Sequence, residues 1–172
     1  MVEETEVITI RVPISLKMKL EEKAKKEQQT LNSTINKLLF KEFNWDEYTS
    51  DLGWMQFDPS VIREIFSHLN EEQITKIAEQ SKKVIISNIR FIYEYPTLDN
   101  SIEFITSWLK SSKMSYRLVK NGHYKLTVSH DLGKNWSIFA NLLTKKWFEE
   151  LGFRFGTHME EVKNYSLEVF EK

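Results

Sequence analysis

The chain has 172 residues, of which 41% are hydrophobic and 28% are charged, and its formal net charge is -1. These fractions are typical of an ordinary globular protein, so we expect packed domains rather than long disordered tracts. The sequence contains no cysteine, which excludes disulfides, thiolate metal sites and a cysteine nucleophile. An acidic amino terminus and the lack of a long apolar run predict neither a signal peptide nor a membrane span, so a cytoplasmic protein is the default expectation.

Charged and aromatic residues are unevenly distributed along the chain. Residues 7–43 carry eight basic and four acidic side chains, a balance of +4, whereas residues 44–172 carry 16 basic and 18 acidic ones, a balance of -2. All five tryptophans belong to the later part. We therefore predict a first domain at 1–43, a connector at 44–57 and a second domain at 58–172. A polyanionic partner is expected to bind the first domain.

The first predicted element is a β-strand at residues 7–12. Five of these six residues are β-branched, and such side chains fit a pleated surface better than a helix. Alternation places Ile8, Ile10 and Val12 on one face and Val7, Thr9 and Arg11 on the other. The residues that follow have a helical pattern, so no second strand lies nearby in the sequence. Because a lone short strand is not stable in water, we predict that it pairs with the same strand of a second copy in a symmetric homodimer.

Two short helices are predicted after this strand. Ser15 is expected to cap the first, which runs to about Glu27, and Thr30 or Asn32 is expected to cap the second, which runs to about Phe43. Apolar residues form a stripe on each helix: Leu16, Leu20 and Ala24 on the first, and Leu31, Ile35, Leu38 and Leu39 on the second. A strand and two helices of this length cannot bury their own core, so their apolar faces also require a partner.

The order and spacing of these residues resemble a known family. The run Ile8 to Pro13, the four-residue spacing that ends at Ala24 and the run Thr30 to Ser33 are together similar to the ribbon-helix-helix domain of Arc- and MetJ-type repressors. The resemblance covers residues 6–43, and no family is recognised for the remainder. It implies an intertwined dimer whose two-stranded ribbon enters the major groove of double-stranded DNA.

The resemblance also implies which residues contact DNA. Strand positions that face base edges are Val7, Thr9 and Arg11, and the helix start whose backbone N–H groups bind a phosphate is Thr30, Leu31 and Asn32. Arg11 suits this role because its guanidinium can donate two hydrogen bonds to guanine. Thr9 can hydrogen-bond to a base or place its methyl group against thymine.

The chain departs from the family pattern at two positions. Val7 is apolar where a polar reader of bases is common, so that position reads a thymine methyl group or nothing. Gln28 stands in the turn between the helices where glycine is common. A left-handed backbone at Gln28 would be slightly strained, because its side chain disfavours that conformation.

The second domain is predicted to mix helices and strands. Helical patterns cover 58–69, 70–95, a stretch that begins at Asp99 or Asn100, and 133–151, whereas alternating patterns cover 116–120, 123–128, 153–155 and 165–170. Asn121-Gly122 predicts a hairpin with a two-residue loop, in which Val119 faces Tyr124. The predicted fold class is therefore α+β: an amino-terminal ribbon-helix-helix unit and a carboxy-terminal domain with helices packed on one face of a small antiparallel sheet.

Few residues of the second domain suggest chemistry. A metal site would form from His130 and His158, with Asp131 or Glu160 as oxygen ligands, only if their strand ends meet. Such a site would be similar to that of a metal-sensing ribbon-helix-helix repressor. Ser129-His130-Asp131 has the residue types of a catalytic triad, but adjacent strand positions point apart. The aromatic helix at 133–151 is more typical of a core than of a ligand site, although a cavity among its rings would indicate a small-molecule sensor. We predict no enzyme, no catalytic residue, no metal and no cofactor.

Together these patterns predict a homodimeric, sequence-specific transcriptional regulator that binds double-stranded DNA through a ribbon strand in the major groove. Two alternatives stay open: an antitoxin with autoregulatory DNA binding, and a repressor that responds to a metal or a small molecule. Antitoxin tails are usually disordered alone, whereas residues 58–170 have the composition of a domain that folds by itself. Partners are thus DNA, a second copy, with higher assembly left open, and an unidentified small-molecule effector.

Overall fold

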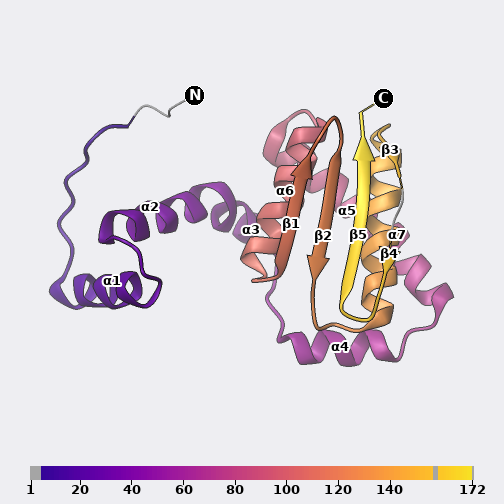
Figure 1. Cartoon of the computed structure of the whole chain (residues 1–172), viewed down its shortest axis with the longest axis horizontal. Helices are drawn as coiled ribbons and strands as arrows, with labels where there is room; N and C mark the ends of the chain where they lie inside the picture. The colour runs from indigo at the N-terminus through magenta and orange to yellow at the C-terminus, as the bar shows by residue number, and fades with distance from the viewer. Residues whose placement is uncertain (1–4, 157–158, 172) are drawn as a thin grey trace. The chain divides into compact units, whose positions relative to one another are not determined.

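The computed structural model describes residues 5–156 and 159–171 of the chain. It divides into two compact units, Met1–Tyr48 and Thr49–Lys172 (Figure 1). The boundary between the units falls inside the segment expected to be a connector. Helices dominate the first unit, and helices with a β-sheet form the second.

The first unit consists of an extended segment and a series of helices. The segment at 5–13 leads into α1 (Ile14–Lys26), and a short turn joins α1 to α2 (Leu31–Lys41). A π-helix (Glu42–Asp46) follows α2 without an intervening loop, and it continues into α3 (Glu47–Asp51), within which the first unit ends at Tyr48. Helical structure therefore extends past the predicted end of the second helix at residue 43.

The two predicted helix starts of this unit have different outcomes. Pro13 occupies the cap position of α1, and its carbonyl accepts hydrogen bonds from the backbone N–H groups of Leu16 and Lys17, both at 3.0 Å. The predicted cap at Ser15 is therefore wrong, because the first helical turn is already formed when the chain reaches it. Thr30 caps α2 as predicted, since its Oγ1 accepts from the backbone N–H of Ser33 at 3.1 Å.

The turn between α1 and α2 contains a residue in the left-handed conformation. Gln28 has a φ of 53°, and the next residue, Gln29, donates its N–H to the carbonyl of Ala24 at 2.9 Å. Any residue with a Cβ is strained in this conformation. The strain falls at the position where the ribbon-helix-helix family commonly has glycine.

Four longer helices belong to the second unit: α4 (Pro59–Ser67), α5 (Glu71–Tyr93), α6 (Leu98–Ser111) and α7 (Lys134–Glu150). Asp58 caps α4 by accepting from the backbone N–H of Ser60 at 2.8 Å. Asn70 and Gln73 form a reciprocal capping box at the start of α5. The cap of α6 is Thr97 rather than the expected Asp99 or Asn100, because its Oγ1 accepts from the Asn100 N–H at 3.1 Å.

The strands form one antiparallel sheet at the carboxy-terminal end of the chain. They are β1 (Ser115–Lys120), β2 (Tyr124–Ser129), β3 (Arg154–Phe155), β4 (Met159–Glu160) and β5 (Asn164–Phe170). Their order is β1-β2-β5-β3, and β4 pairs with β5 beside this path. The predicted α+β class with a small antiparallel sheet is confirmed for this unit, and β4 is an addition to the four expected strands.

The hairpin of β1 and β2 forms where Asn121-Gly122 predicts it, but its register differs by one residue. Tyr124 pairs with Lys120 rather than with Val119, so the loop has three residues instead of two. His123 joins the loop because its carbonyl accepts from the Asn121 N–H at 3.0 Å and its ring stacks on Phe170 with centroids 4.5 Å apart. Val119 therefore lies on the exposed face of the sheet, contrary to expectation.

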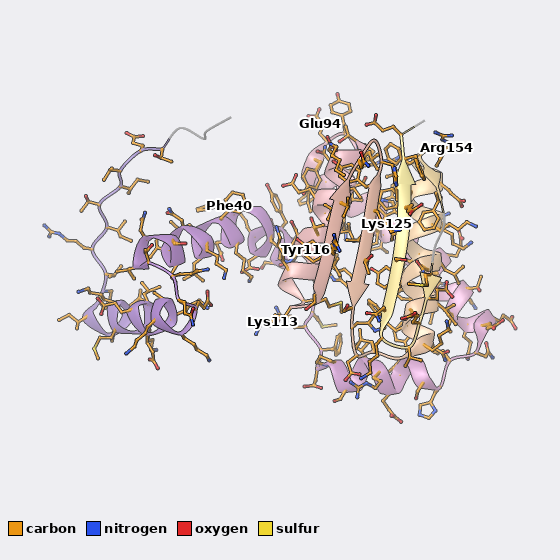
Figure 2. All side chains as sticks on the ribbon, in the orientation of Figure 1. Phe40, Glu94, Lys113, Tyr116, Lys125 and Arg154 are labelled. Carbon is orange, nitrogen blue, oxygen red and sulfur yellow. The ribbon has the colours of Figure 1, made fainter. Side chains whose placement is uncertain are left out.

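Helices cover one face of this sheet, as Figure 1 shows. α6 and α7 pack against the strands, and α5 packs against α6 and α7. Inward-facing residues of β2 and β5 are buried: Tyr124, Leu126, Val128, Tyr165, Leu167 and Val169. On the open face Lys125 pairs with Glu168 at 2.9 Å (Figure 2).

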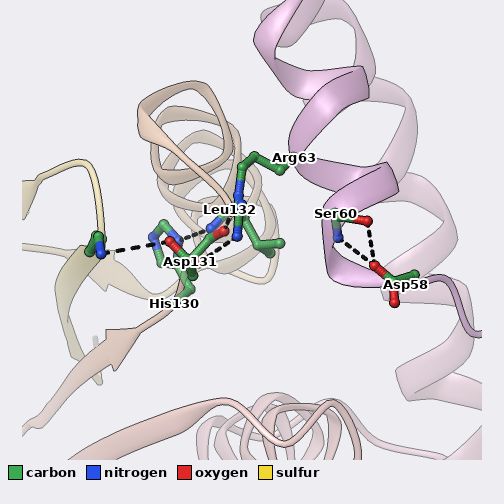
Figure 3. A network of polar contacts seen from close by, with 7 residues as sticks. Asp58, Ser60, Arg63, His130, Asp131 and Leu132 are labelled. Carbon is green, nitrogen blue, oxygen red and sulfur yellow. Dashed lines mark hydrogen bonds and ion pairs between the residues drawn. The ribbon is translucent and has the colours of Figure 1, made fainter.

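Polar contacts fasten α4 to the loop between β2 and α7 (Figure 3). Arg63 donates from Nε to the carbonyl of Asp131 at 2.6 Å, and its Nη2 pairs with the Asp131 carboxylate at 2.5 Å. Lys163 Nζ lies 3.8 Å from the other carboxylate oxygen. These contacts hold α4 beside the loop that follows β2, although the two segments are far apart in the sequence.

Candidate nucleic-acid interface

The strand residues expected to read bases lie on a solvent-exposed, extended segment. Val7 is 92% exposed and Ile8 is 79% exposed. Thr9 and Arg11 are also exposed, as is Ile10 at 57%. Both alternating sets of side chains therefore face solvent in the single chain, including the set expected to be buried.

This segment is not a β-strand within one chain. Residues 5–12 have no strand assignment and make no backbone hydrogen bond to any other residue that the structure describes. The predicted strand at 7–12 is thus absent from the single chain, because a strand needs a ladder partner and the first unit offers only helices. Pairing with a second copy stays a prediction.

The helices of the first unit also leave apolar side chains exposed. Large exposed residues on or beside α1 and α2 are Ile14, Leu16, Met18, Leu38, Leu39, Phe40 and Phe43. Within its described part, only Ala24, Thr34 and Trp45 are buried. The expectation that these helices cannot complete a core is consistent with this exposure.

The helix start expected to bind phosphate has free backbone donors. The Thr30 hydroxyl caps α2 by accepting from the Ser33 N–H, and the Thr30 carbonyl accepts from the Thr34 N–H at 3.0 Å. The N–H groups of Leu31 and Asn32 make no hydrogen bond to a described residue. Two donors at the positive end of the α2 dipole are therefore available to an anion.

Ion pairs neutralise half of the basic residues of this unit. The pairs are Lys17–Glu21 at 3.3 Å, Lys23–Glu27 at 2.7 Å, Lys37–Glu27 at 2.9 Å and Lys41–Asp46 at 2.5 Å. The remaining cations are Arg11, Lys19, Lys25 and Lys26, which are exposed and pair with no carboxylate of the described residues. These four are the side chains best placed to meet a polyanion.

Glu27 links the two helices electrostatically. Its hydrogen bonds with Lys23 of α1 and Lys37 of α2 hold the pKa of the Glu27 carboxyl at about 2, below its ordinary value of 4.5. At neutral pH Glu27 is therefore ionised and holds two of the lysines away from a phosphate. This leaves Lys19, Lys25 and Lys26 as the unpaired cations of α1 among the described residues, two of them in its last turn.

Sequence reasoning missed Lys19, Lys25 and Lys26 as candidate phosphate contacts. The spacing of charged residues could have indicated which lysines are paired and which are free, since ion pairs form between helix residues four apart. That spacing also matches Glu21–Lys25 and Glu22–Lys26, neither of which pairs in the structure. Spacing alone could not select the observed pairs.

The six predicted site residues fall into two groups. Thr30, Leu31 and Asn32 come together at one helix start, whereas Val7, Thr9 and Arg11 share the extended segment. No hydrogen bond, ion pair or ring contact joins the two groups among the residues that the structure places. Their convergence on one DNA surface is a property only of the predicted dimer.

The structure describes three of the four residues that were considered for a metal site, His130, Asp131 and Glu160. His130 uses both ring nitrogens, with Nε2 2.8 Å from Ser137 Oγ and Nδ1 accepting from the Leu132 N–H at 3.1 Å, and burial lowers its pKa. Asp131 pairs with Arg63, and His158 lies outside the described residues. Across 5–156 and 159–171, no group of three or more metal-binding side chains converges.

Comparisons with known proteins add no relative. No protein-family model, no curated protein and no solved structure matches the chain. Among the described helices, none has the length and apolar character needed to span a membrane.

Proposed function

We propose that this chain is a homodimeric, sequence-specific DNA-binding transcriptional regulator. In the dimer, residues 7–12 of two copies pair as an antiparallel ribbon that enters the major groove of double-stranded DNA. The observation that supports this most directly is the extended segment itself, which has no backbone partner among the described residues although its alternating apolar residues are exposed. An open strand edge of this kind recruits another chain.

Pairing would give each side chain of the segment a defined role. Ile8, Ile10 and Val12 would face the exposed apolar residues of α1 and α2, and their burial would stabilise the dimer. Thr9 and Arg11 would face the base edges from the opposite side of the ribbon.

Phosphate contacts would fix the register of the ribbon in the groove. The free N–H groups of Leu31 and Asn32 suit one phosphate, because the amino terminus of α2 favours an anion. Lys25 and Lys26 carry charge that no described carboxylate neutralises, and this charge suits neighbouring phosphates. Such contacts give affinity without sequence preference.

The second unit favours a regulator over an antitoxin. Residues from Thr49 onward form a compact unit with its own core, whereas an antitoxin tail typically orders only on its toxin. Limited proteolysis of the full chain without any partner separates the two. A resistant fragment that begins near residue 49 supports a regulator, and rapid loss of the whole second unit supports an antitoxin.

Selection of duplexes from a random-sequence pool tests DNA binding for any operator sequence. We expect a palindromic motif to be enriched and its affinity to fall steeply with salt, by about 0.9 in the logarithmic slope for each phosphate contact. Arg11→Ala is expected to relax preference at one base position by about 1–3 kcal/mol. Lys17→Ala is the control, because Lys17 already pairs with Glu21, and it should change affinity little and evenly.

The dimer has its own test. Ile10→Asp places a charge on the apolar face of the ribbon and is expected to give a monomer in analytical ultracentrifugation, with loss of DNA binding. Val162→Asp is the matched control, since Val162 is equally exposed in the second unit at 60%, and it should remain a dimer. A wild-type monomer that selects no motif would refute the proposal.

A further inference from the structure

A cavity of about 290 Å³ lies inside the second unit, between α5, α6, α7 and the inner face of β5. Tryptophan rings dominate its lining: Trp54, Trp108, Trp136 and Trp147. The wall from α5 reaches the surface, because Val84 is 57% exposed while Ser81 is half-buried. A ligand therefore has a route into the cavity at α5.

The lining rings are held by one another and by hydrogen bonds. Trp108 and Trp136 are nearly parallel with centroids 6.3 Å apart, and Phe104 meets Trp147 edge-on at 5.9 Å. With the Asn88 side-chain amide oriented to satisfy both neighbours, its oxygen accepts from Trp54 Nε1 at 3.1 Å. The aromatic walls are thus preformed, which reduces the entropy lost when a ring-shaped ligand binds.

The chemistry of the lining excludes a charged ligand. No acidic, basic or histidine side chain of the described residues lines this cavity, and an ion moved into such surroundings would lose its hydration without compensation. Ring faces and edges favour another aromatic system in stacked or edge-on contact.

Two buried polar groups of the lining are left for a ligand, and the first is the indole N–H of Trp147, which has no hydrogen-bond partner among the described residues. The second is the hydroxyl of Tyr165, a residue that is 1% exposed and whose hydroxyl is surrounded by buried apolar groups without a charged or hydrogen-bonding partner among the described residues. Burial raises the pKa of Tyr165, so the hydroxyl stays protonated and can donate. Thr144 does not compete for a ligand, because its Oγ1 already donates to the Ala140 carbonyl.

The volume sets the size of the occupant. An apolar cavity of about 150 Å³ holds a benzene molecule, so one of about 290 Å³ has room for two fused rings. We propose that this cavity binds an uncharged, two-ring aromatic molecule that carries one hydrogen-bond acceptor. This site does not depend on the proposed DNA binding.

Quinoline and naphthalene are a matched pair of probes, because they share a shape and only quinoline has an acceptor nitrogen. In calorimetric titrations of the full chain at pH 7.5, we expect saturable one-to-one binding of both. The anion 2-naphthoate is expected to bind at least tenfold more weakly. Tyr165→Phe should weaken quinoline binding about five- to tenfold and leave naphthalene within twofold, because only quinoline loses a hydrogen bond.

Two variants that fill the cavity complete the test. Ala140→Leu projects into the cavity from α7 and should weaken both probes more than tenfold. Ser81→Leu does the same from the half-buried wall of α5, where overpacking is less severe, and thermal unfolding verifies that it is folded. Absence of saturable quinoline binding to the wild type, or undiminished binding to a folded Ser81→Leu variant, would overturn the proposal. Arg11→Ala should leave quinoline binding unchanged, which separates this result from the DNA-binding tests.

Discussion

The two units of the molecule differ in what they complete by themselves. From Thr49 onward, helices and strands satisfy one another, and Leu126, Phe148 and Leu167 are fully buried. In the first unit the extended segment has no ladder partner among the described residues, and apolar residues of α1 and α2 face solvent. The difference teaches that one unit can complete its own core and sheet, while the other leaves apolar side chains and a backbone segment exposed, which is the basis of the proposed pairing with a second copy.

The largest expected effect tests whether the second unit closes its own core. Phe148→Ala is expected to lower the free energy of unfolding by about 3–5 kcal/mol, because it leaves a cavity among α7 and its neighbours. Phe91→Ala is the control at a 60% exposed position of the same unit, with an expected change of about 0.5 kcal/mol or less. Urea unfolding followed by tryptophan fluorescence measures both, and the Phe148→Ala loss should not depend on protein concentration.

A pair of helix caps compares the units directly. Thr30→Ala and Thr97→Ala each remove a hydroxyl that accepts a backbone N–H at 3.1 Å, at an expected cost of about 1 kcal/mol. The Thr30→Ala loss should depend on protein concentration, because it acts on the unit proposed to dimerise. Thr97→Ala should lower thermal stability equally at all concentrations. Identical concentration dependence in the two variants would contradict the comparison.

Substitution of two residues that have a left-handed backbone should change the free energy of unfolding by a smaller amount, and should raise it rather than lower it. Gln28 has a φ of 53° in the first unit and Lys113 has a φ of 55° after α6 in the second. Gln28→Gly and Lys113→Gly are each expected to raise the free energy of unfolding by about 0.5–1 kcal/mol, because glycine relieves the strain of that conformation. Differential scanning calorimetry would show a higher melting temperature for each, and a lower one would contradict the assigned backbone.

Acid provides the mildest test, because the relevant ion pairs are exposed. Lysines hold the pKa of Glu27 and of Glu79 at about 2, below the ordinary value of 4.5. A depressed pKa means that the stabilisation is present above about pH 4.5 and is lost as the pH falls toward 2. Glu27→Gln should flatten this dependence for the first unit and Glu79→Gln for the second, as measured by thermal unfolding between pH 2 and 6.

Local signals predicted much of the second unit. Asp58 and Asn70 identified the starts of α4 and α5, since a short polar side chain before an apolar stripe satisfies the first backbone donors. Asn121-Gly122 located the hairpin, but the register depended on the carbonyl and ring of His123. That contact involves Phe170, which is distant in sequence, so local pattern could not supply it.

The candidate sites were predictable to different degrees. The backbone donors of Leu31 and Asn32 follow from the cap at Thr30, which the sequence indicates. The partner of the segment at 7–12 belongs to another molecule under the proposal, so one chain cannot display the pairing. The aromatic cavity depends on how three helices pack, and the pattern of Trp136 and Phe139 alone is typical of ordinary core.

The sheet has an open edge strand, β1, and the composition of this strand limits how copies of the chain associate. β1 pairs only with β2 among the described strands, so its outer row of amide groups is unsatisfied by the sheet. Arg117 is exposed on this short strand, whereas Lys120 pairs with Asp99 at 3.1 Å, and a charged side chain on an edge strand opposes pairing with another chain. Edge-to-edge polymerisation through the sheet is thereby discouraged, and this would leave the segment at 7–12 as the place where we propose that two copies pair.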